Sequence, residues 1–394
     1  MRRVAIVGAG MVRFGKREGD SLMDMLTKAS LSAMDDAGIG DGPVDALYVG
    51  NMAAGMLNHQ TAIASALADT LNLLPAAADA IENGPASGGS ALKNGVLAVA
   101  SGYYDRVLVV GGEKMSSVIG PKATDMMATM AHPQAEYIYG ATLPSLAGMF
   151  ARLYMQQYGI IPLQLAKVAI KNHNNATRNP YAHFRTAITL ADILTGPQAP
   201  SNNPVVAEPL RRYDCCPVSD GAAAVVLCPA ELAKSFGQPA VTVAGFGQAT
   251  DTHTLQERDD PTELRAVRIA SQKAFAMAQL APSDVHVAEL HDAFTILEIA
   301  ESEQAGFFEM GEGAKALDEG VTEIGGRLPI NPSGGLKARG HALGATGIAQ
   351  VVELVWQLRG DAGERQVKGA EVGFSLNFGG MGNNVLAFVL RREA

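Results

Sequence analysis

Charged side chains are scarce in this sequence. Only 18% of its 394 residues are charged, whereas soluble chains usually carry about a quarter. This deficit predicts that much of the surface is buried, and extensive contacts between subunits would bury it. The 31 basic residues are outnumbered by 40 acidic ones, which gives a net charge of −9. No general attraction to nucleic acid or to anionic lipid is therefore expected.

Cysteines and long apolar runs are also sparse. The three cysteines, Cys215, Cys216 and Cys228, lie in one short stretch, and the adjacent pair is poorly placed for an ordinary disulfide. No segment reaches the roughly 18 uninterrupted apolar residues of a membrane span. Basic residues and no small-residue cleavage pattern follow the apolar run Val4–Val12, so we interpret it as a first strand rather than a signal peptide. These absences favour a cytoplasmic protein in a reducing compartment.

Short apolar runs alternate with segments of helical periodicity in the first half. Strands are predicted at residues 4–8, 46–50 and 106–112, and a helix at 22–34. A long helical stretch is expected from residue 51 to about residue 79. This alternation predicts an α/β fold, and 43 glycines, against an average of about 7%, predict many tight turns.

The second half repeats this order. The matching pairs are 241–245 with 4–8, 264–277 with 22–34, 285–290 with 46–49, and the closing strands 384–389 with 222–227. A repeat of nearly half the chain indicates a duplicated domain rather than a solenoid. The segment 115–205 has no counterpart and is interpreted as an inserted loop domain of the kind that often covers a ligand.

These observations divide the chain into three parts. Residues 1–114 with 206–235 form the N-terminal half, residues 115–205 the loop domain, and residues 236–394 the C-terminal half.

The segment Pro85–Ser90 lies between a predicted strand and a helix rich in small residues. The free N–H groups of a helix N-terminus suit an anion or oxyanion there. Alternatively, Ser87, Gly88 and Gly89 only allow two helices to approach closely. Spacing alone does not separate the two interpretations.

Two histidines follow strands at matching ends of the predicted sheets. His291 begins directly after an apolar strand, and His341 stands among glycines. Ligands bind at the carboxyl ends of such strands, where a histidine can act as a base. A single histidine is more often a core or surface residue, but two in equivalent places favour a catalytic role. Asn377 follows another strand and can donate hydrogen bonds to a carbonyl or a histidine.

Other candidate sites are weaker. His173 and His183 lie near several asparagines without the spacing of metal ligands, so we expect solvated loop residues and no metal. Gly8 and Gly10 lack the third glycine and the acidic residue of a dinucleotide site, so no nicotinamide cofactor is expected.

Six motifs occur in order along the chain. They are Ser-Gly-Gly at 87–89, Cys-Pro-Val-Ser-Asp-Gly at 216–221, His-Asp-Ala-Phe-Thr at 291–295, Asn-Pro-Ser-Gly-Gly at 331–335, Gly-His-Ala-Leu-Gly-Ala-Thr-Gly at 340–347 and Asn-Phe-Gly-Gly at 377–380. In these motifs, over nearly its whole length, the sequence resembles the thiolase superfamily. It is most similar to the archaeal and sterol-carrier-type thiolases, which carry a histidine at the position of His291.

The resemblance implies a fold and a ligand class. We expect a duplicated five-layered αβαβα fold with an inserted loop domain. We also expect a homodimer or a dimer of dimers, with an acyl-CoA or coenzyme A lying under the loop domain as substrate and no other cofactor.

It also implies roles for individual residues. His341 would be the base that activates the nucleophile, and His291 would hold a water or donate directly to the thioester oxygen. Asn377 and the Gly380 backbone would assist the second half-reaction. The positions expected to contact coenzyme A are Ser219, Ser333 and Gly334.

One departure from the family pattern concerns the nucleophile. Related thiolases carry Cys-Ala-Ser-Gly at the turn that presents the nucleophile, here called the elbow. In this chain the elbow is Pro85-Ala86-Ser87-Gly88. Proline has neither a thiol to be acylated nor the N–H that in the family helps to bind the acyl oxygen. Ser87 is an unpromising replacement because it would turn into the helix.

Three functions therefore stay open. The first is an acyl-CoA C-acyltransferase that cleaves β-ketoacyl-CoA. The second is a retro-aldol lyase acting on β-hydroxyacyl-CoA, which needs no acyl-enzyme, although lyases of the superfamily carry tyrosines where His291 and His341 stand. The third is a non-catalytic, coenzyme A-binding subunit that assembles with a small zinc-binding OB-fold protein.

Overall fold

The computed structural model describes residues 2–236 and 239–393. Within them, nine strands form one sheet in the order β3-β2-β4-β7-β1-β8-β11-β10-β9. They are β1 (Val4–Met11), β2 (Ala46–Gly50), β3 (Ala77–Ile81), β4 (Val107–Glu113), β7 (Gly221–Pro229), β8 (Val241–Thr250), β9 (Val287–Glu289), β10 (Val372–Gly379) and β11 (Asn384–Arg392). Only the pairs Ala5–Thr242 and Ile6–Val241 join the N-terminal strands to the C-terminal ones. The sheet is therefore two half-sheets, one from each half of the chain.

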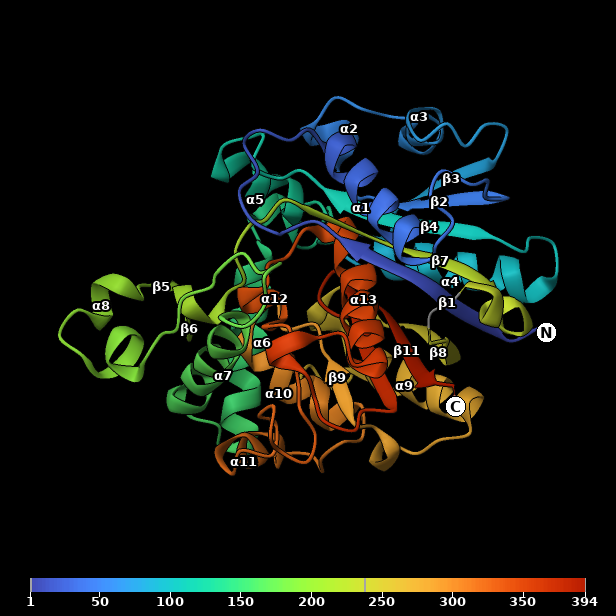
Figure 1. Cartoon of the computed structure of the whole chain (residues 1–394). Helices are drawn as coiled ribbons and strands as arrows, with labels where there is room; N and C mark the ends of the chain where they lie inside the picture. Colours follow the sequence, from blue (N-terminus) through green and yellow to red (C-terminus); the bar gives the residue numbers. More distant parts are fainter. Residues whose placement is uncertain (1, 237–238, 394) are drawn as a thin grey trace.

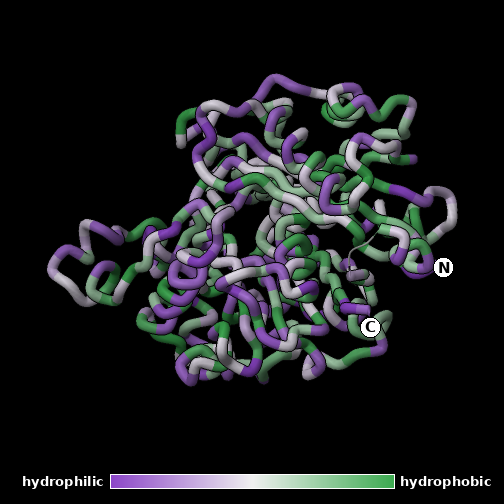
Figure 2. Tube along the Cα trace, in the orientation of Figure 1, coloured by the Kyte–Doolittle hydropathy of each residue, from purple (hydrophilic) through white to green (hydrophobic). Residues whose placement is uncertain are grey.

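Helices complete a five-layered αβαβα arrangement, which confirms the expected fold class (Figure 1). The outer helices α1 (Leu22–Asp36) and α3 (Ile63–Thr70) cover the N-terminal strands. α4 (Ser87–Ser101) and α13 (Thr346–Arg359) lie between the two half-sheets, and α9 (Arg265–Ala278) and α10 (Thr295–Gln304) cover the far side. Apolar residues follow the central strands, whereas hydrophilic ones are common in the peripheral loops (Figure 2). Each interface between layers is thus a hydrophobic core.

The central helices approach each other closely because their residues are small. A Cβ on Gly88 of α4 would lie 2.5 Å from the carbonyl oxygen of Gly344, which precedes α13. Only glycine tolerates this separation. The N-termini of the two central helices therefore meet, and the catalytic candidates lie around this meeting point.

The expectation of one long helix up to residue 79 is wrong. The segment instead forms α2 (Ala54–Leu57), α3 and strand β3. His59, Ala62 and Asn72 have positive φ angles, which interrupt a helix, and β3 pairs in parallel with β2. The small residues of β3 carry little strand propensity, so the pairing with β2 decides its conformation.

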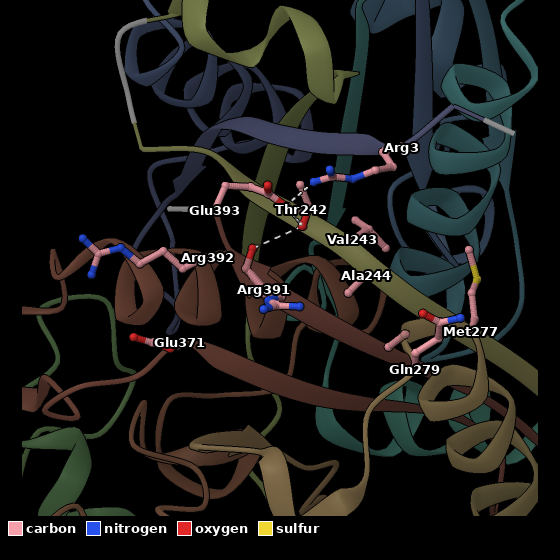
Figure 3. Close-up of a pocket in the computed structure, with 11 residues that line it drawn as sticks. Arg3, Thr242, Val243, Ala244, Met277, Gln279, Glu371, Arg391, Arg392 and Glu393 are labelled. Atoms are coloured by element: carbon pink, nitrogen blue, oxygen red, sulfur yellow. Dashed lines mark hydrogen bonds and ion pairs between the residues drawn. The ribbon is translucent and has the colours of Figure 1, made fainter.

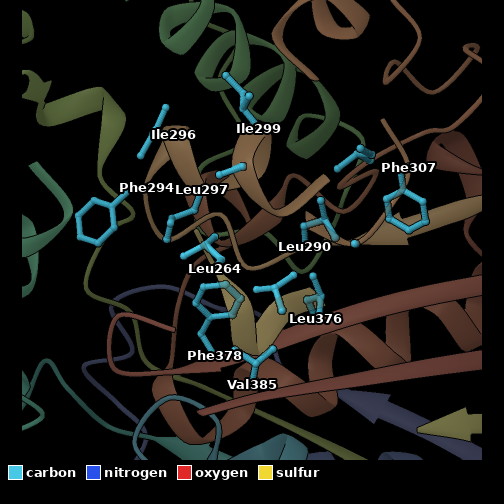
Figure 4. Packing of buried hydrophobic residues seen from close by; sticks show 14 of the residues in the cluster. Leu264, Leu290, Phe294, Ile296, Leu297, Ile299, Phe307, Leu376, Phe378 and Val385 are labelled. Carbon is cyan, nitrogen blue, oxygen red and sulfur yellow. The ribbon is translucent and has the colours of Figure 1, made fainter. Parts of the chain in front are cut away.

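The segment 115–205 is mostly helical. It contains α5 (Gly120–Ala128), α6 (Leu143–Tyr158), α7 (Pro162–Ala176) and α8 (Ala199–Asn202), followed by the small hairpin β5 (Val205–Ala207) and β6 (Leu210–Arg211). α6 and α7 pack on the outer core of the C-terminal half, which includes Leu290 and Phe378 (Figure 4). Two short helices, α11 (Gly313–Asp318) and α12 (Gly335–Ala338), lie near α7. The domain boundaries at residues 114 and 205 stay a prediction.

None of the helices in the described ranges combines the length and the apolar character needed to cross a membrane.

Candidate active site

Four segments bring the expected catalytic residues together. His291 follows β9, and Asn377 lies near the end of β10. His341 precedes α13, and Pro85 forms the turn before α4. The rings of His291 and His341 meet edge to face, with centroids 5.0 Å apart. Both strands end at the same edge of the C-terminal half-sheet because β9 and β10 are parallel.

The hydrogen bonds of His341 fix its tautomer. Its Nδ1 lies 2.7 Å from the hydroxyl oxygen of Thr346, and that hydroxyl donates to the carbonyl oxygen of Ala342 at 3.0 Å. With the single hydroxyl proton assigned to the bond with Ala342, we assign Nδ1 of His341 as the donor to Thr346. Nε2 therefore carries a lone pair and can accept a proton.

His291 is in the opposite tautomer. Its Nδ1 accepts hydrogen bonds from the backbone N–H of Phe378 and from the side-chain amide of Asn377, both at 3.4 Å. The imidazole is also stacked on the Phe378 ring, with centroids 5.3 Å apart. Its proton therefore resides on Nε2, which can donate. The pair thus offers one base and one hydrogen-bond donor.

Both imidazoles are neutral at physiological pH. Burial lowers the pKa of His341 to about 3 and the pKa of His291 well below its ordinary value, and the charge of Arg339 acts in the same direction. Arg339 is itself fully buried and packs over the Phe14 ring at 5.4 Å. A neutral imidazole can accept a proton through one nitrogen and donate through the other.

Asn377 connects the two halves at the elbow. Its Oδ1 accepts from the N–H of Gly89, and its Nδ2 donates to the carbonyl oxygen of Pro85, each at 3.1 Å. Gly380 has a φ of +58°, and a Cβ on Gly84 would lie 3.8 Å from its nitrogen. The backbone at residues 84 and 85 therefore lies next to that of Gly380.

The elbow itself offers no nucleophile. Pro85 replaces the cysteine of related chains, and the Ser87 hydroxyl is occupied. It accepts from the N–H of Asn83 at 2.8 Å and donates to the carbonyl oxygen of Gly84 at 2.6 Å. Ser87 is fully buried, so it stabilises the turn.

Ser219 is also part of the site, and its expected contact with coenzyme A stays a prediction. Its hydroxyl oxygen accepts from the backbone N–H of His341 at 3.2 Å and lies 2.9 Å from Nδ1 of His183, while its proton goes to the carbonyl oxygen of Pro217 at 3.3 Å. His183 therefore donates to Ser219. The serine holds the main chain of His341 and connects it to the loop domain.

Ser333 and Gly334 face other parts of the protein. The buried Ser333 hydroxyl donates to Glu289 at 2.7 Å, and a Cβ on Gly334 would lie 2.6 Å from the Cβ of Ala176 in α7. Their protein contacts run to Glu289 and α7, and the expected contact with coenzyme A stays a prediction.

The expectation of a solvated loop residue is wrong for His173, whereas His183 does lie in a loop and is partly exposed. His173 lies in α7 and is 4% exposed, and its ring is stacked on Phe184 with centroids 5.7 Å apart. Burial lowers the pKa of His173 to about 4. The inward face of α7 was not apparent from its asparagines, of which Asn172 and Asn175 are buried through hydrogen bonds to the C-terminal half. In the ranges that the structure describes, no group of three or more His, Cys, Asp or Glu side chains is arranged to hold a metal.

Glu113, at the end of β4, belongs to the site but was not among the residues predicted from the sequence. Its carboxylate accepts from the backbone N–H groups of Met52, Ala53 and Gly344 and from the side chain of Asn51, at 2.9–3.1 Å. Burial nevertheless raises its pKa to about 7. Glu113 thereby fixes the loop that carries His341. An acidic residue ending an otherwise apolar strand was the available signal.

Two cavities lie next to this framework, and another lies at a distance from it. One of about 420 Å³ lies between the loop domain and residues 206–217, and its lining includes Phe184, Arg212, Cys216 and Lys337. A second, of about 570 Å³, adjoins Gly84 and Gly380. A third, of about 890 Å³, lies near the chain termini, where Thr242 and Glu393 are hydrogen-bonded, away from the histidines (Figure 3).

The family follows from a comparison with known proteins. A family model described as "Thiolase, N-terminal domain" matches residues 4–231, and one described as "Thiolase C-terminal domain-like" matches residues 247–392. The chain belongs to the thiolase family. The resemblance inferred from the six motifs is therefore confirmed.

Individual thiolase relatives span the whole chain. An acetyl-CoA acetyltransferase of Methanothermobacter thermautotrophicus is 46% identical over 100% of both chains. Human sterol carrier protein 2 is 32% identical over 96% of this thiolase and 70% of its own length. Among solved structures, an "Ltp2-ChsH2(DUF35) aldolase" superposes with a TM-score of 0.83 at 27% identity, covering 99% of this chain and 98% of that one.

Proposed function

We propose that this thiolase-family protein breaks or forms the bond between the α- and β-carbons of a β-hydroxyacyl-CoA by an aldol-type reaction that needs no acyl-enzyme. The observation that carries this proposal is the pairing of a base at His341 with a donor at His291, next to a proline at residue 85. Such a pair suffices for an enolate reaction and lacks what covalent acyl transfer requires.

The reaction assigns one task to each imidazole. In the cleavage direction, Nε2 of His341 takes the proton of the β-hydroxyl group. The electron pair of the carbon–carbon bond moves into the thioester as an enolate, whose oxygen accepts the hydrogen bond of Nε2 of His291. The β-carbon leaves as an aldehyde or ketone. The proton on His341 then passes to the α-carbon, which gives the shortened acyl-CoA.

The alternative nucleophiles are poorly suited to acyl transfer. Burial raises the thiol pKa of both Cys215 and Cys216 to about 12, so their thiolate forms are scarce at neutral pH. Proline at residue 85 also removes one N–H donor from the acyl oxygen site. Loss of such a donor alone costs about 100- to 1000-fold in rate.

Acyl transfer is the second candidate function. It is favoured by the 46% identity to a protein named acetyl-CoA acetyltransferase. The aldolase named above, at 27% identity, supports the first candidate. The two histidines count against the first candidate, because lyases of the superfamily carry tyrosines where His291 and His341 stand.

The coenzyme A moiety would occupy the cavity of about 420 Å³ beneath the loop domain. Two cationic side chains, Arg212 and Lys337, contribute to its lining. Lys337 donates to the carbonyl oxygen of Cys215 at 2.7 Å, which leaves two further N–H groups for an anionic ligand. The pantetheine arm would then run past residues 216–219 toward His341.

The edge of the sheet supports a homodimer. Strand β3 pairs only with β2 in the described sheet, and its partly exposed residues include one charge, Asp79. An unprotected edge of this kind pairs readily with a second copy. Sedimentation velocity is expected to give twice the mass of one chain or a multiple of that dimer. A monomer at micromolar concentration would contradict this proposal.

A small OB-fold partner is a further proposal. It is supported by the name of the related aldolase, which contains a DUF35 component. If this chain were only the coenzyme A-binding subunit of such a complex, it would bind coenzyme A and turn over neither substrate class alone.

A product assay separates these functions. The purified protein is incubated with 3-hydroxybutyryl-CoA, and separately with acetoacetyl-CoA plus coenzyme A, followed by product and intact-mass analysis. We expect acetaldehyde and acetyl-CoA from the first substrate without a protein adduct. An acetylated protein with acetyl-CoA formed only from the second substrate would establish acyl transfer instead. Coenzyme A binding without either product would support the non-catalytic role.

The two imidazoles are tested by substitution. His341→Ala and His291→Ala are each expected to lower kcat by about 100- to 10,000-fold, with coenzyme A binding unchanged. His286→Ala is the matched control because His286 lies at the surface before β9. An unaltered rate in either site variant would refute the mechanism.

A further inference from the structure

The cavity of about 570 Å³ adjoins the place where the elbow meets Gly380. Gly84 and Gly380 both line it, and neither has a side chain that could separate the cavity from residue 85. Both also adopt positive φ angles, +54° and +58°, which L side chains rarely adopt. The cavity therefore begins one residue from Pro85 along the chain, and a substituent on the reacting carbon would enter it past these two glycines.

The lining of this cavity has two parts, one of flexible apolar side chains and one of polar side chains. The apolar part consists of Met52, Met56 and Met130. The polar part consists of Glu82, Asn83, Thr129, Thr250, Asp251, His253, Asn383 and Asn384. Methionine adapts to irregular shapes, whereas carboxamides and imidazole present directed hydrogen bonds.

The polar groups are positioned to bind a neutral partner. Nδ1 of His253 accepts from the side-chain amide of Asn383 at 2.8 Å, so Nε2 of His253 carries a proton to donate. Glu82 accepts from the N–H of Gly84 at 2.6 Å, which holds a carboxylate at the rim. Asp251 is paired with Arg265 at 3.2 Å. The fixed charge of Glu82 disfavours a carboxylate ligand.

We propose that this cavity receives the part of the acyl group beyond the β-carbon and selects short groups with uncharged hydroxyl or carbonyl functions. Carboxylates are disfavoured by Glu82. Long alkyl chains are disfavoured because they leave the polar side chains without hydrogen-bond partners. The inference rests on the proposed function only for the position of the reacting bond.

Binding of unreactive analogues tests the inference apart from catalysis. Coenzyme A thioethers lack the carbonyl that forms an enolate, so they are not turned over. Calorimetry compares coenzyme A with its 3,4-dihydroxybutyl, 3-hydroxydecyl and 3-hydroxy-4-carboxybutyl thioethers, using the protein in its native oligomeric state. The dihydroxybutyl analogue is expected to bind at least about tenfold more tightly than the other two, a difference of about 1.4 kcal/mol.

A variant that fills the cavity completes the test. Met130→Trp is expected to abolish the preference while leaving the Kd of coenzyme A within about twofold. Met149→Trp, on the exposed face of α6, is the matched control and should retain the preference. A preference for the decyl or carboxyl analogue, or a Met130→Trp variant that keeps the original order, would overturn the inference. If the aldol assay gave no product, only the proposed function would be contradicted. The binding results would still test the selectivity of the cavity.

Discussion

The side-chain amide of Asn377 donates a hydrogen bond to the carbonyl oxygen of Pro85. The main chain at residue 85 is thereby tied to the C-terminal half, although proline supplies neither a thiol nor an N–H group. The elbow has thus lost the chemical groups of a nucleophile while its backbone remains attached to the site.

Restoring the cysteine should create an acylation site. Pro85→Cys is expected to form a covalent acetyl adduct with acetyl-CoA, detected by intact mass, because His341 offers an unprotonated Nε2. Pro85→Ala is the matched control, since it restores the N–H without a thiol and should form no adduct. If Pro85→Cys also stays unmodified, the neighbouring groups no longer support covalent catalysis.

Ser219 should act on the position of His341 rather than on ligand affinity. Ser219→Ala removes the acceptor for the His341 N–H and for His183. We expect kcat to fall by about 10- to 100-fold, corresponding to about 1.4–2.7 kcal/mol, while the Kd of coenzyme A changes by less than about twofold.

Ser201→Ala, at an exposed serine of α8, should change neither quantity and serves as the control. The opposite pattern, weaker coenzyme A binding with an unaltered kcat, would favour the direct ligand contact implied by the family resemblance.

Glu113→Gln should destabilise the fold. The amide would direct donors at N–H groups that now donate to the carboxylate, leaving buried polar groups unpaired. Urea denaturation is expected to give a free energy of unfolding lower by about 2–4 kcal/mol. Glu312→Gln, which removes only an exposed ion pair with Lys315, should cost less than about 1 kcal/mol. Equal losses in both variants would contradict the role assigned to Glu113.

Protonation of His341 should couple stability to pH with a definite sign. Its pKa is about 3 in the folded protein and about 6.5 when unfolded. The unfolded state therefore binds the extra proton below pH 6.5, so stability is complete above that value and declines as the pH falls. Between pH 7 and pH 5 this group contributes a loss of about 2 kcal/mol.

The comparison of wild type with His341→Gln isolates this contribution, because the other titrating groups are common to both. The difference in unfolding free energy between pH 7 and pH 5 should be smaller in the variant by that amount. A proton NMR titration of the His341 ring midway near pH 6.5 in the folded wild type would contradict the buried, neutral state.

Elements determined by local sequence patterns were predicted correctly, whereas elements determined by tertiary contacts were not. Long apolar strands such as β4 and β7 and the helix α1 were predicted within a few residues, because burial and periodicity act locally. Strand β3 was missed, since its alanines favour helix and only the pairing with β2 makes them extended. His173 was misplaced because nothing local to α7 reveals which face meets the C-terminal half.

The sequence by itself determined the family, the duplication and the two candidate catalytic imidazoles, because motifs and hydrophobic periodicity are properties of the linear chain. Only the tertiary structure decided which imidazole is the base and which is the donor. That assignment depends on Thr346 and Phe378, whose hydrogen bonds fix the two tautomers. The hydrogen-bond partners around an imidazole determine which ring nitrogen carries the proton. Which groups become these partners depends on the fold, so the local sequence does not specify them.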